Sequence, residues 1–196
     1  ALIGCGRIAN NHFEAIGKHA GRCELTDVCD MDPAALKAAV EKTGAQGHDH
    51  IAALLAKSKA DCVVLTTPSG LHPVQAAEAA RAGFDVMTEK PMATRGSDGL
   101  AMVRACDEAG VRLFVVKQNR RNRTLQMLKQ AVEKGRFGRI YMVGVNVFWT
   151  RPQAYYDSSA WRGTWEFDGG AFMNQASHYV DLLDWIVGPI ESVMAY

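Results

Sequence analysis

The sequence predicts an α/β protein whose first part is a doubly wound parallel sheet. Three observations carry this prediction. Apolar strand-like runs alternate with amphipathic helical segments through residue 116, a G-x-G-x-x-A turn follows the first run, and the pattern changes after residue 116. Strands and helices in regular alternation are typical of βαβ units. We therefore expect one domain at 1–116 and the beginning of a second domain at 117–196.

Five apolar runs are the expected strands of the first domain, at 1–3, 24–29, 61–67, 84–89 and 111–116. The segments between them carry helix-start signals. Asp32 precedes a proline at the first turn of one helix, Asp49 precedes a second helix, and Ser97 or Asp98 precedes a third. Because short polar side chains accept hydrogen bonds from the free N–H groups of a helix start, we expect caps at these positions.

The second part has a different pattern. A basic segment at 117–138 indicates a helix that ends at Gly135 or Gly138, and 139–149 alternates like a strand. A loop rich in Trp and Tyr leads to a helix within 168–185, and 188–196 is expected to be another strand. A lone strand pair is not a stable sheet, and the chain lacks an initiator Met. We therefore expect it to be a fragment of a longer protein.

Composition excludes several classes of protein. The chain has 196 residues and 48% hydrophobic content, enough for a sizeable core. The 22 Lys and Arg balance 21 Asp and Glu, so overall charge suggests neither nucleic acid nor an anionic membrane as partner. The five cysteines form no CxxC pair, which favours a cytoplasmic location and no metal site. No apolar stretch approaches the roughly 20 residues that cross a bilayer.

The turn after the first expected strand fits a dinucleotide-binding fingerprint. Gly4 permits the tight turn, Gly6 lets the backbone approach a pyrophosphate, and Ala9 allows close helix packing. Asp30 ends the next strand near the spacing expected for the acid that binds the ribose hydroxyls. A carboxylate there would repel a 2′-phosphate, so NAD is favoured, although Arg7 keeps NADP open. Glycine-rich turns also occur in α/β proteins without nucleotides.

Polar turns follow two later strands, at 66–73 and 88–91. Ligands of open α/β sheets bind beyond the carboxyl ends of the strands, so these turns are candidate site elements. Lys90 lies between Glu89 and a proline, where its stem would enter a cleft. A lysine assists removal of a hydroxyl proton only if burial or a neighbouring charge lowers its pKa. A surface lysine paired with Glu89 is an equal alternative.

A row of side chains occupies the helix within 168–185. Asn174, His178, Asp181 and Trp185 are spaced 4, 3 and 4 residues apart, which places them on one helix stripe. The pair of glycines before them would let a flat ring approach the backbone. We expect Asp181 to orient the imidazole of His178 on the wall of a cleft. A buried structural histidine is the plainer alternative.

These motifs resemble a known family. The strings GCGRIA, TTPSGLHP, EKPMA and GGAFMNQASHYVDLLDWIVG, in this order, are similar to the glucose-fructose oxidoreductase and inositol dehydrogenase (Gfo/Idh/MocA) family of NAD(P)-dependent dehydrogenases. The resemblance covers essentially the whole chain. It implies a Rossmann domain followed by an α/β domain with a large open sheet, of which this chain holds only the beginning.

The resemblance implies roles residue by residue. Lys90 and His178 would be the catalytic pair, with a cis bond before Pro91. Residues implied to bind the cofactor are Gly4, Gly6, Arg7, Ile8, Asp30, Thr67, Pro68, Ser69, His72, Glu89, Lys90, Gln118, Trp161 and Arg162. Residues implied to contact the substrate are Lys90, Arg120, Arg151, Asn174 and His178. Many family members have Asp where this chain has Asn174, and an amide cannot act as a base.

A longer set of strings resembles one branch of the family, the UDP-N-acetyl-2-amino-2-deoxyglucuronate dehydrogenases: KQNRRNRTLQMLK, RFGRIYMV, NVFWTRPQAYYD and WRGTWEFDGGAFMNQASHYVDLLDW. That branch implies NAD-dependent oxidation of the 3-hydroxyl of UDP-N-acetylglucosaminuronate in bacterial surface-polysaccharide (O-antigen) synthesis, with 2-oxoglutarate as reoxidant, and the family often forms tetramers. The sequence also clusters cations that suit a diphosphate and a carboxylate: Lys117, Arg120, Arg121, Arg123, Arg151 and Arg162. A solvated basic helix face is the alternative.

Two other functions stay open. One is an NAD(P)-dependent dehydrogenase of another sugar or of a free polyol such as an inositol, which needs no diphosphate site. The other is a non-catalytic NAD-sensing module, against which the Lys90 and His178 pair argues.

Overall fold

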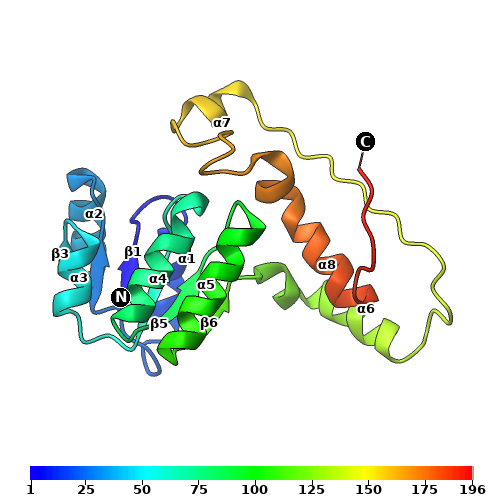
Figure 1. Cartoon of the computed structure of the whole chain (residues 1–196), viewed down its shortest axis with the longest axis horizontal. Coiled ribbons are helices and arrows are strands. Elements are labelled where there is room, and N and C mark those ends of the chain that lie inside the picture. Colours follow the sequence, from blue (N-terminus) through cyan, green and yellow to red (C-terminus); the bar gives the residue numbers. More distant parts are fainter. Residues whose placement is uncertain (196) are drawn as a thin grey trace.

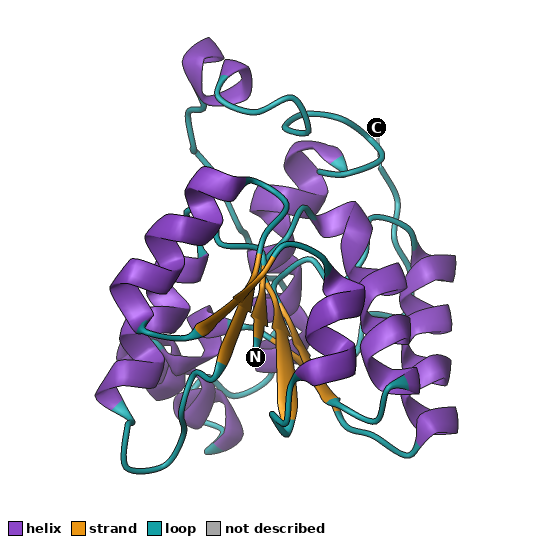
Figure 2. Cartoon of the chain, turned by 90° about the vertical axis from the view of Figure 1, so that its left-hand side faces the viewer, coloured by secondary structure: helices purple, strands orange, loops and turns teal. Residues whose placement is uncertain are grey.

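The computed structural model describes residues 1–195 and contains a six-stranded parallel sheet. The strands are β1 (Leu2–Ile3), β2 (Asp27–Cys29), β3 (Gln46–His48), β4 (Cys62–Leu65), β5 (Asp85–Thr88) and β6 (Leu113–Val115). Their order, β3-β2-β1-β4-β5-β6, is that of a Rossmann fold. The predicted fold class is confirmed, and all five expected strands are present. Figures 1 and 2 show helices on both faces of the sheet.

The strand β3 was not predicted from the sequence. It is an edge strand that pairs only with β2, in the register Val28 to Gly47. Its sequence, QGH, carries no apolar residue. Gly47 lies so close to α2 that a Cβ there would come 2.9 Å from Val40. Hydrophobic patterning cannot detect such a short polar strand.

Five helices cover the sheet: α1 (Ala9–Lys18), α2 (Pro33–Thr43), α3 (Ile51–Lys57), α4 (His72–Arg81) and α5 (Gly96–Ala109). The Asp32 cap is confirmed, because its Oδ1 accepts a hydrogen bond from the N–H of Ala34 at 2.9 Å. The Asp49 and Ser97 or Asp98 caps are wrong. The helix α3 begins after His50 and α5 begins after Arg95, each without a side-chain hydrogen bond at the cap. The N-cap residues are therefore His50 and Arg95, whose side chains make no such hydrogen bond, and the predicted capping residues lie one to three residues away from these positions.

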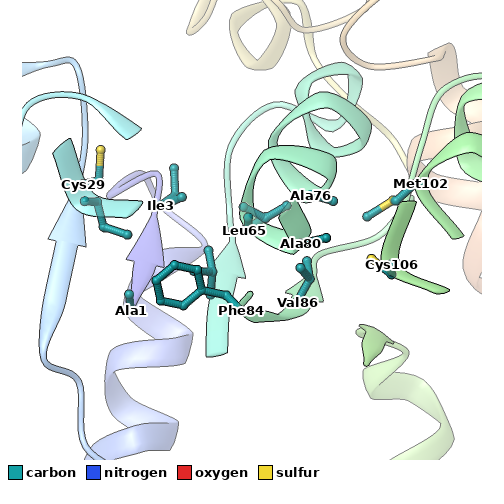
Figure 3. Packing of buried hydrophobic residues seen from close by; sticks show 13 residues of the cluster. Ala1, Ile3, Cys29, Leu65, Ala76, Ala80, Phe84, Val86, Met102 and Cys106 are labelled. Atoms are coloured by element: carbon teal, nitrogen blue, oxygen red, sulfur yellow. The ribbon is translucent and has the colours of Figure 1, made fainter. Parts of the chain in front are cut away.

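Alternating side chains of the strands supply the core on each face of the sheet. Ile3 contributes to a buried cluster with residues of α4 and α5, as Figure 3 shows, whereas Leu2 packs with Phe13 of α1 on the other face. Successive residues of a strand point to opposite faces. The two clusters bury both faces of β1, which is an inner strand of the sheet, and so they fix the position of the turn that follows β1.

The second part contains a 3-10 turn, η2 (Gln118–Arg121), then α6 (Arg123–Glu133), α7 (Gln153–Asp157), a π-helical turn, η3 (Phe172–Ala176), and α8 (Ser177–Val187). In Figure 1, α6 lies beside α8, and their contact is direct. The helix predicted at 117–138 is shorter in the structure, where α6 begins only after η2 and ends at Glu133. None of the described helices is long and apolar enough to cross a membrane.

Two predicted strands of the second part are wrong. Residues 139–149 and 188–195 form no strand, and residue 196 lies outside the described residues. A strand needs a partner edge for its N–H and C=O groups, and the described part of the chain offers none here. The apolar side chains of 139–149 are correspondingly exposed, Phe148 to 89%.

Candidate functional site

A cavity of about 510 Å³ opens beyond the carboxyl ends of β1, β2, β4 and β5. Its wall includes every residue implied to bind the cofactor: Gly4, Gly6, Arg7, Ile8, Asp30, Thr67, Pro68, Ser69, His72, Glu89, Lys90, Gln118, Trp161 and Arg162. Asn174 also lines the cavity, whereas Arg120, Arg151 and His178 do not line it. The structure thus brings residues from both parts of the chain to one place.

The turn after β1 requires glycine at its first position. Gly4 has φ of +96°, and a Cβ there would lie 2.8 Å from the backbone N of Thr67 and 2.9 Å from the carbonyl carbon of Thr66. The turns after β1 and β4 therefore meet backbone to backbone. Only a residue without a side chain permits this approach.

Asp30 holds the same turn from the other side. Its Oδ2 accepts a hydrogen bond from the N–H of Cys5 at 2.6 Å, and its Oδ1 accepts one from the N–H of Asp32 at 2.8 Å. Burial, together with the nearby charge of Asp30, raises the pKa of the Cys5 thiol to about 12. The end of β2 thus presents an oriented carboxylate beside the glycine-rich turn.

His72 joins the turns that follow β4 and β5. Its Nδ1 lies 3.0 Å from the carbonyl oxygen of Pro91, and its Nε2 lies 2.9 Å from that of Thr67. Burial lowers the pKa of His72, so the ring is neutral at neutral pH and donates to one carbonyl at a time. His72 therefore clamps two segments of backbone as well as lining the cavity.

Glu89 is held by a residue that sequence reasoning missed. Its Oε1 lies 2.8 Å from Nε2 of His12, on α1, and its Oε2 accepts a hydrogen bond from the N–H of Lys90 at 3.2 Å. Burial raises the pKa of Glu89, but these hydrogen bonds outweigh burial and the net pKa is lowered. His12 is a lone histidine on an amphipathic helix, and no sequence signal distinguishes it from an ordinary surface residue.

Lys90 reaches across to the second part of the chain. Its Nζ donates a hydrogen bond to the main-chain oxygen of Asn174 at 3.1 Å, and the bond to Pro91 is cis, as the resemblance implied. Burial lowers the pKa of Lys90, and the charges of Lys117 and Arg151 lower it further, against Glu89 and Asp168. This lysine is therefore a half-buried cation that loses its proton more readily than a surface lysine.

His178 is buried at the start of α8. Burial lowers its pKa, and the positive charges of Lys90 and Lys117 lower it further. Its ring meets Trp149 edge to face, with centroids 6.2 Å apart. Lys90 and His178 are thus electrostatic neighbours from separate parts of the chain.

The expectation that Asp181 orients His178 is wrong. Asp181 instead accepts two hydrogen bonds from Arg120, from Nε at 2.9 Å and from Nη2 at 2.7 Å, and Lys117 lies 3.6 Å away. The two positive side chains lower the pKa of Asp181 although burial opposes them. The fork of Arg120 is therefore occupied by a carboxylate of the chain itself.

Two other arginines stack on aromatic rings. The guanidinium carbon of Arg151 lies 5.3 Å from the ring centroid of Trp149 and 5.1 Å from that of Tyr155. Arg162 lies 4.2 Å from the centroid of Tyr155, and its buried Nε has no hydrogen-bond partner among residues 1–195. Burying a hydrogen-bond donor without a partner costs free energy. A ligand in this cavity that offers an acceptor to Nε of Arg162 would remove that cost.

Asp168 is a second residue that sequence reasoning missed. It is 1% exposed, its Oδ1 accepts a hydrogen bond from Nδ2 of Asn174, and its Oδ2 accepts one from the N–H of Gly163 at 2.9 Å. It directly precedes the glycine pair, and no sequence signal marks it, because its contacts with Gly163 and Asn174 exist only in the folded structure.

Comparisons with known proteins identify the family to which the chain is similar. The family model described as "Oxidoreductase family, NAD-binding Rossmann fold" matches residues 1–117, and the "GFO/IDH/MocA C-terminal domain" model matches residues 125–196. Curated relatives include a D-apiose dehydrogenase from Paraburkholderia graminis, 34% identical over 70% of this chain and 37% of the relative. An inositol 2-dehydrogenase from Saccharopolyspora erythraea is 29% identical over 95% of this chain and 53% of the relative.

Two solved structures are much more similar. The WlbA dehydrogenase from Chromobacterium violaceum, in complex with NADH and UDP-GlcNAcA, is 73% identical with a TM-score of 0.96, over 97% of this chain and 55% of that chain. The WlbA dehydrogenase from Bordetella pertussis, with the same ligands, is 67% identical with a TM-score of 0.96, over 97% and 57%. The present chain thus spans about half the length of its relatives. With both family models matched, the chain belongs to the GFO/IDH/MocA family of oxidoreductases.

Proposed function

We propose that the full-length protein is an NAD-dependent dehydrogenase that oxidises the 3-hydroxyl of UDP-N-acetylglucosaminuronate to the 3-keto sugar. One observation carries this proposal: a half-buried lysine, Lys90, lies at the wall of a cavity built from a Rossmann fingerprint and is tied to the segment that bears His178. The similarity to two WlbA dehydrogenases, which bind NADH and UDP-GlcNAcA, supports the choice of substrate.

The residues present fit a dinucleotide. The turn at Gly4 and Gly6 leaves backbone N–H groups for a pyrophosphate, the carboxylate of Asp30 suits ribose hydroxyls, and the buried Nε of Arg162 needs an acceptor. The other residues proposed to hold the cofactor are Arg7, Ile8, Thr67, Pro68, Ser69, His72, Glu89, Lys90, Gln118 and Trp161. The bound nicotinamide would accept the hydride from carbon 3 of the sugar.

Lys90 and His178 are proposed to manage the hydroxyl proton. Removal of a hydride from an alcohol carbon leaves a proton on oxygen, which a neighbouring base must accept. The lowered pKa of each side chain increases the fraction in the neutral form, which is the form that can accept a proton. Asn174 is proposed as a contact to the sugar and Arg151 as a contact to its anionic groups.

Arg120 is proposed to act differently from the other substrate contacts. Because both oxygens of Asp181 hold its fork, Arg120 contributes charge near the sugar site and rigidity between η2 and α8. A free arginine fork would bind a carboxylate or phosphate bidentately, and Arg120 lacks that freedom.

The setting of the full-length enzyme is proposed from the family resemblance. Residues 1–116 would be the cofactor domain, and residues 117–196 would begin a substrate and oligomerisation domain in a homotetramer. The enzyme would work in the cytoplasm, supply a nucleotide sugar for O-antigen synthesis and use 2-oxoglutarate to reoxidise its nicotinamide.

The first test uses full-length protein purified without added nicotinamide. Absorbance of reduced nicotinamide is followed while UDP-N-acetylglucosaminuronate and then 2-oxoglutarate are added. We expect a rise with the sugar and a fall with the keto acid. A flat trace from protein with demonstrable bound NAD would contradict the proposed substrate.

The pH dependence of the same reaction tests the role of His178. Because burial and two nearby cations lower its pKa from the usual 6.5, its neutral form is present at lower pH than for an ordinary imidazole. If His178 is the base, kcat/KM of the full-length protein should fall on acidification with a midpoint below pH 6.5. A His178→Asn variant should lose this limb, and a midpoint above 6.5 would contradict the assignment.

A dehydrogenase of a free polyol is the second candidate, favoured by the similarity to an inositol 2-dehydrogenase. It predicts that inositol, and not the UDP-sugar, reduces the bound NAD. It also predicts that UDP leaves the melting temperature of the full-length protein unchanged, because only a ligand of the native state raises it.

A further inference from the structure

Asp168 connects three segments of the site. Its Oδ2 accepts a hydrogen bond from the N–H of Gly163, which follows the Trp161 and Arg162 pair, and its Oδ1 accepts one from the side chain of Asn174 in η3. At 1% exposure it is the most deeply buried charged residue in the second part of the described chain. Both of its oxygens are thus used inside the protein.

The loop that carries Asp168 is itself anchored on the Rossmann domain. The N–H of Gly70 donates a hydrogen bond to the carbonyl oxygen of Phe167 at 3.1 Å. The hydroxyl of Thr94 donates one to the main-chain carbonyl oxygen of Glu166 at 3.0 Å. A Cβ at Gly70 would lie 2.1 Å from the Glu166 oxygen. This close backbone contact sets the position of Asp168 relative to the strand ends.

The contact with Asp168 determines how Asn174 is oriented. A carboxylate accepts hydrogen bonds only, so the amide nitrogen of Asn174 must face Asp168. The amide oxygen of Asn174 has no hydrogen-bond donor among residues 1–195, and Asn174 lines the cavity. Its main-chain oxygen meanwhile accepts the hydrogen bond from Nζ of Lys90. One residue therefore presents an acceptor to a ligand and holds the lysine.

We propose that Asp168 is a positioning residue of the dehydrogenase site, which orients the amide of Asn174 and, through the backbone of Asn174, the ammonium of Lys90. This inference rests on the proposed function. The buried charge also stabilises the protonated lysine, since Asp168 is among the groups that raise the pKa of Lys90.

The test exchanges the two side chains in full-length protein. In Asp168→Asn, the new amide must use its oxygen for Gly163, so its nitrogen faces Asn174 and forces that amide to turn over. In Asn174→Asp, two carboxylates face each other. In the double variant, the amide at 168 donates to the carboxylate at 174, and both the hydrogen bond and the net charge return. An exposed acid on α5, changed as Asp107→Asn, is the matched control.

Each single variant is expected to lower kcat/KM for the UDP-sugar by roughly 10- to 100-fold, because small displacements of reacting groups cost about this much. The double variant should regain most of the loss, and Asp107→Asn should match wild type. Asp168→Asn should also move the pKa of Lys90 to lower values, measured by NMR of 15N-lysine in the cofactor-free protein, and the double variant should move it back.

Three outcomes would overturn the inference. The first is a wild-type kcat/KM and lysine titration in Asp168→Asn. The second is a double variant no better than the worse single variant with a similar melting temperature. The third is full activity in Asn174→Asp alone, which would mean that the carboxylate at 174 needs no partner. A wild-type protein that turns over no sugar would overturn only the proposed function, because the lysine titration still decides the role of Asp168.

Discussion

Replacement of Lys90 by methionine is expected to lower kcat of the full-length protein by about 10²- to 10⁴-fold, the usual contribution of a general acid or base. Methionine keeps much of the apolar stem but removes the ammonium that bonds to the main-chain oxygen of Asn174. The glycine-rich turn is untouched, since it follows β1 whereas Lys90 follows β5. Affinity for NADH, measured by fluorescence titration, should therefore change little, because Lys90 is only one of the many residues proposed to hold the cofactor.

The matched control is Lys37→Met, which changes a lysine whose side chain is 77% exposed on α2. It should have wild-type kcat. Turnover by Lys90→Met at the wild-type rate would remove Lys90 from the catalytic pair and leave His178 as the proton acceptor.

The change Gly4→Ala is expected to abolish measurable NAD binding and to destabilise the protein by several kcal/mol. An alanine at φ of +96° is strained by about 1–2 kcal/mol. Its Cβ would also press on backbone atoms of Thr66 and Thr67, which cannot rotate aside. Since β1 and β4 are neighbours in the sheet, the turns on both strands must separate.

Urea denaturation and calorimetric titration with NADH measure these two effects. Gly21→Ala is the control, because Gly21 has an ordinary φ and nothing within 4 Å of the position of a Cβ. A Gly4→Ala protein with wild-type stability and NAD affinity would show that the two turns are free to separate.

Most of the Rossmann domain could be predicted because its signals are local. Buried parallel strands are apolar runs, and Asp32 caps α2 through its own side chain. The position of Asp30, directly after β2, follows from the spacing of the fingerprint. The polar edge strand β3 could not be predicted, because its residues are ordered by pairing with β2 and not by their own hydrophobicity.

The second part could be predicted less well because its contacts are long-range. The stripe of Asn174, His178 and Asp181 suggested that Asp181 serves the imidazole, yet Asp181 pairs with Arg120, 61 residues earlier. An ion pair with an arginine fork is stronger than a hydrogen bond to a neutral ring. The alternating pattern at 139–149 likewise indicates a strand, but pairing depends on a partner edge that the pattern itself does not encode.

The buried thiol of Cys5, in the glycine-rich turn after β1, has a consequence for redox signalling. With its pKa raised to about 12, Cys5 carries almost no thiolate at neutral pH. The thiolate is the form that attacks peroxides and disulfides, so Cys5 reacts with them far more slowly than an ordinary thiol. Oxidants therefore do not impair cofactor binding through Cys5, and this residue is unsuited to act as an oxidation sensor.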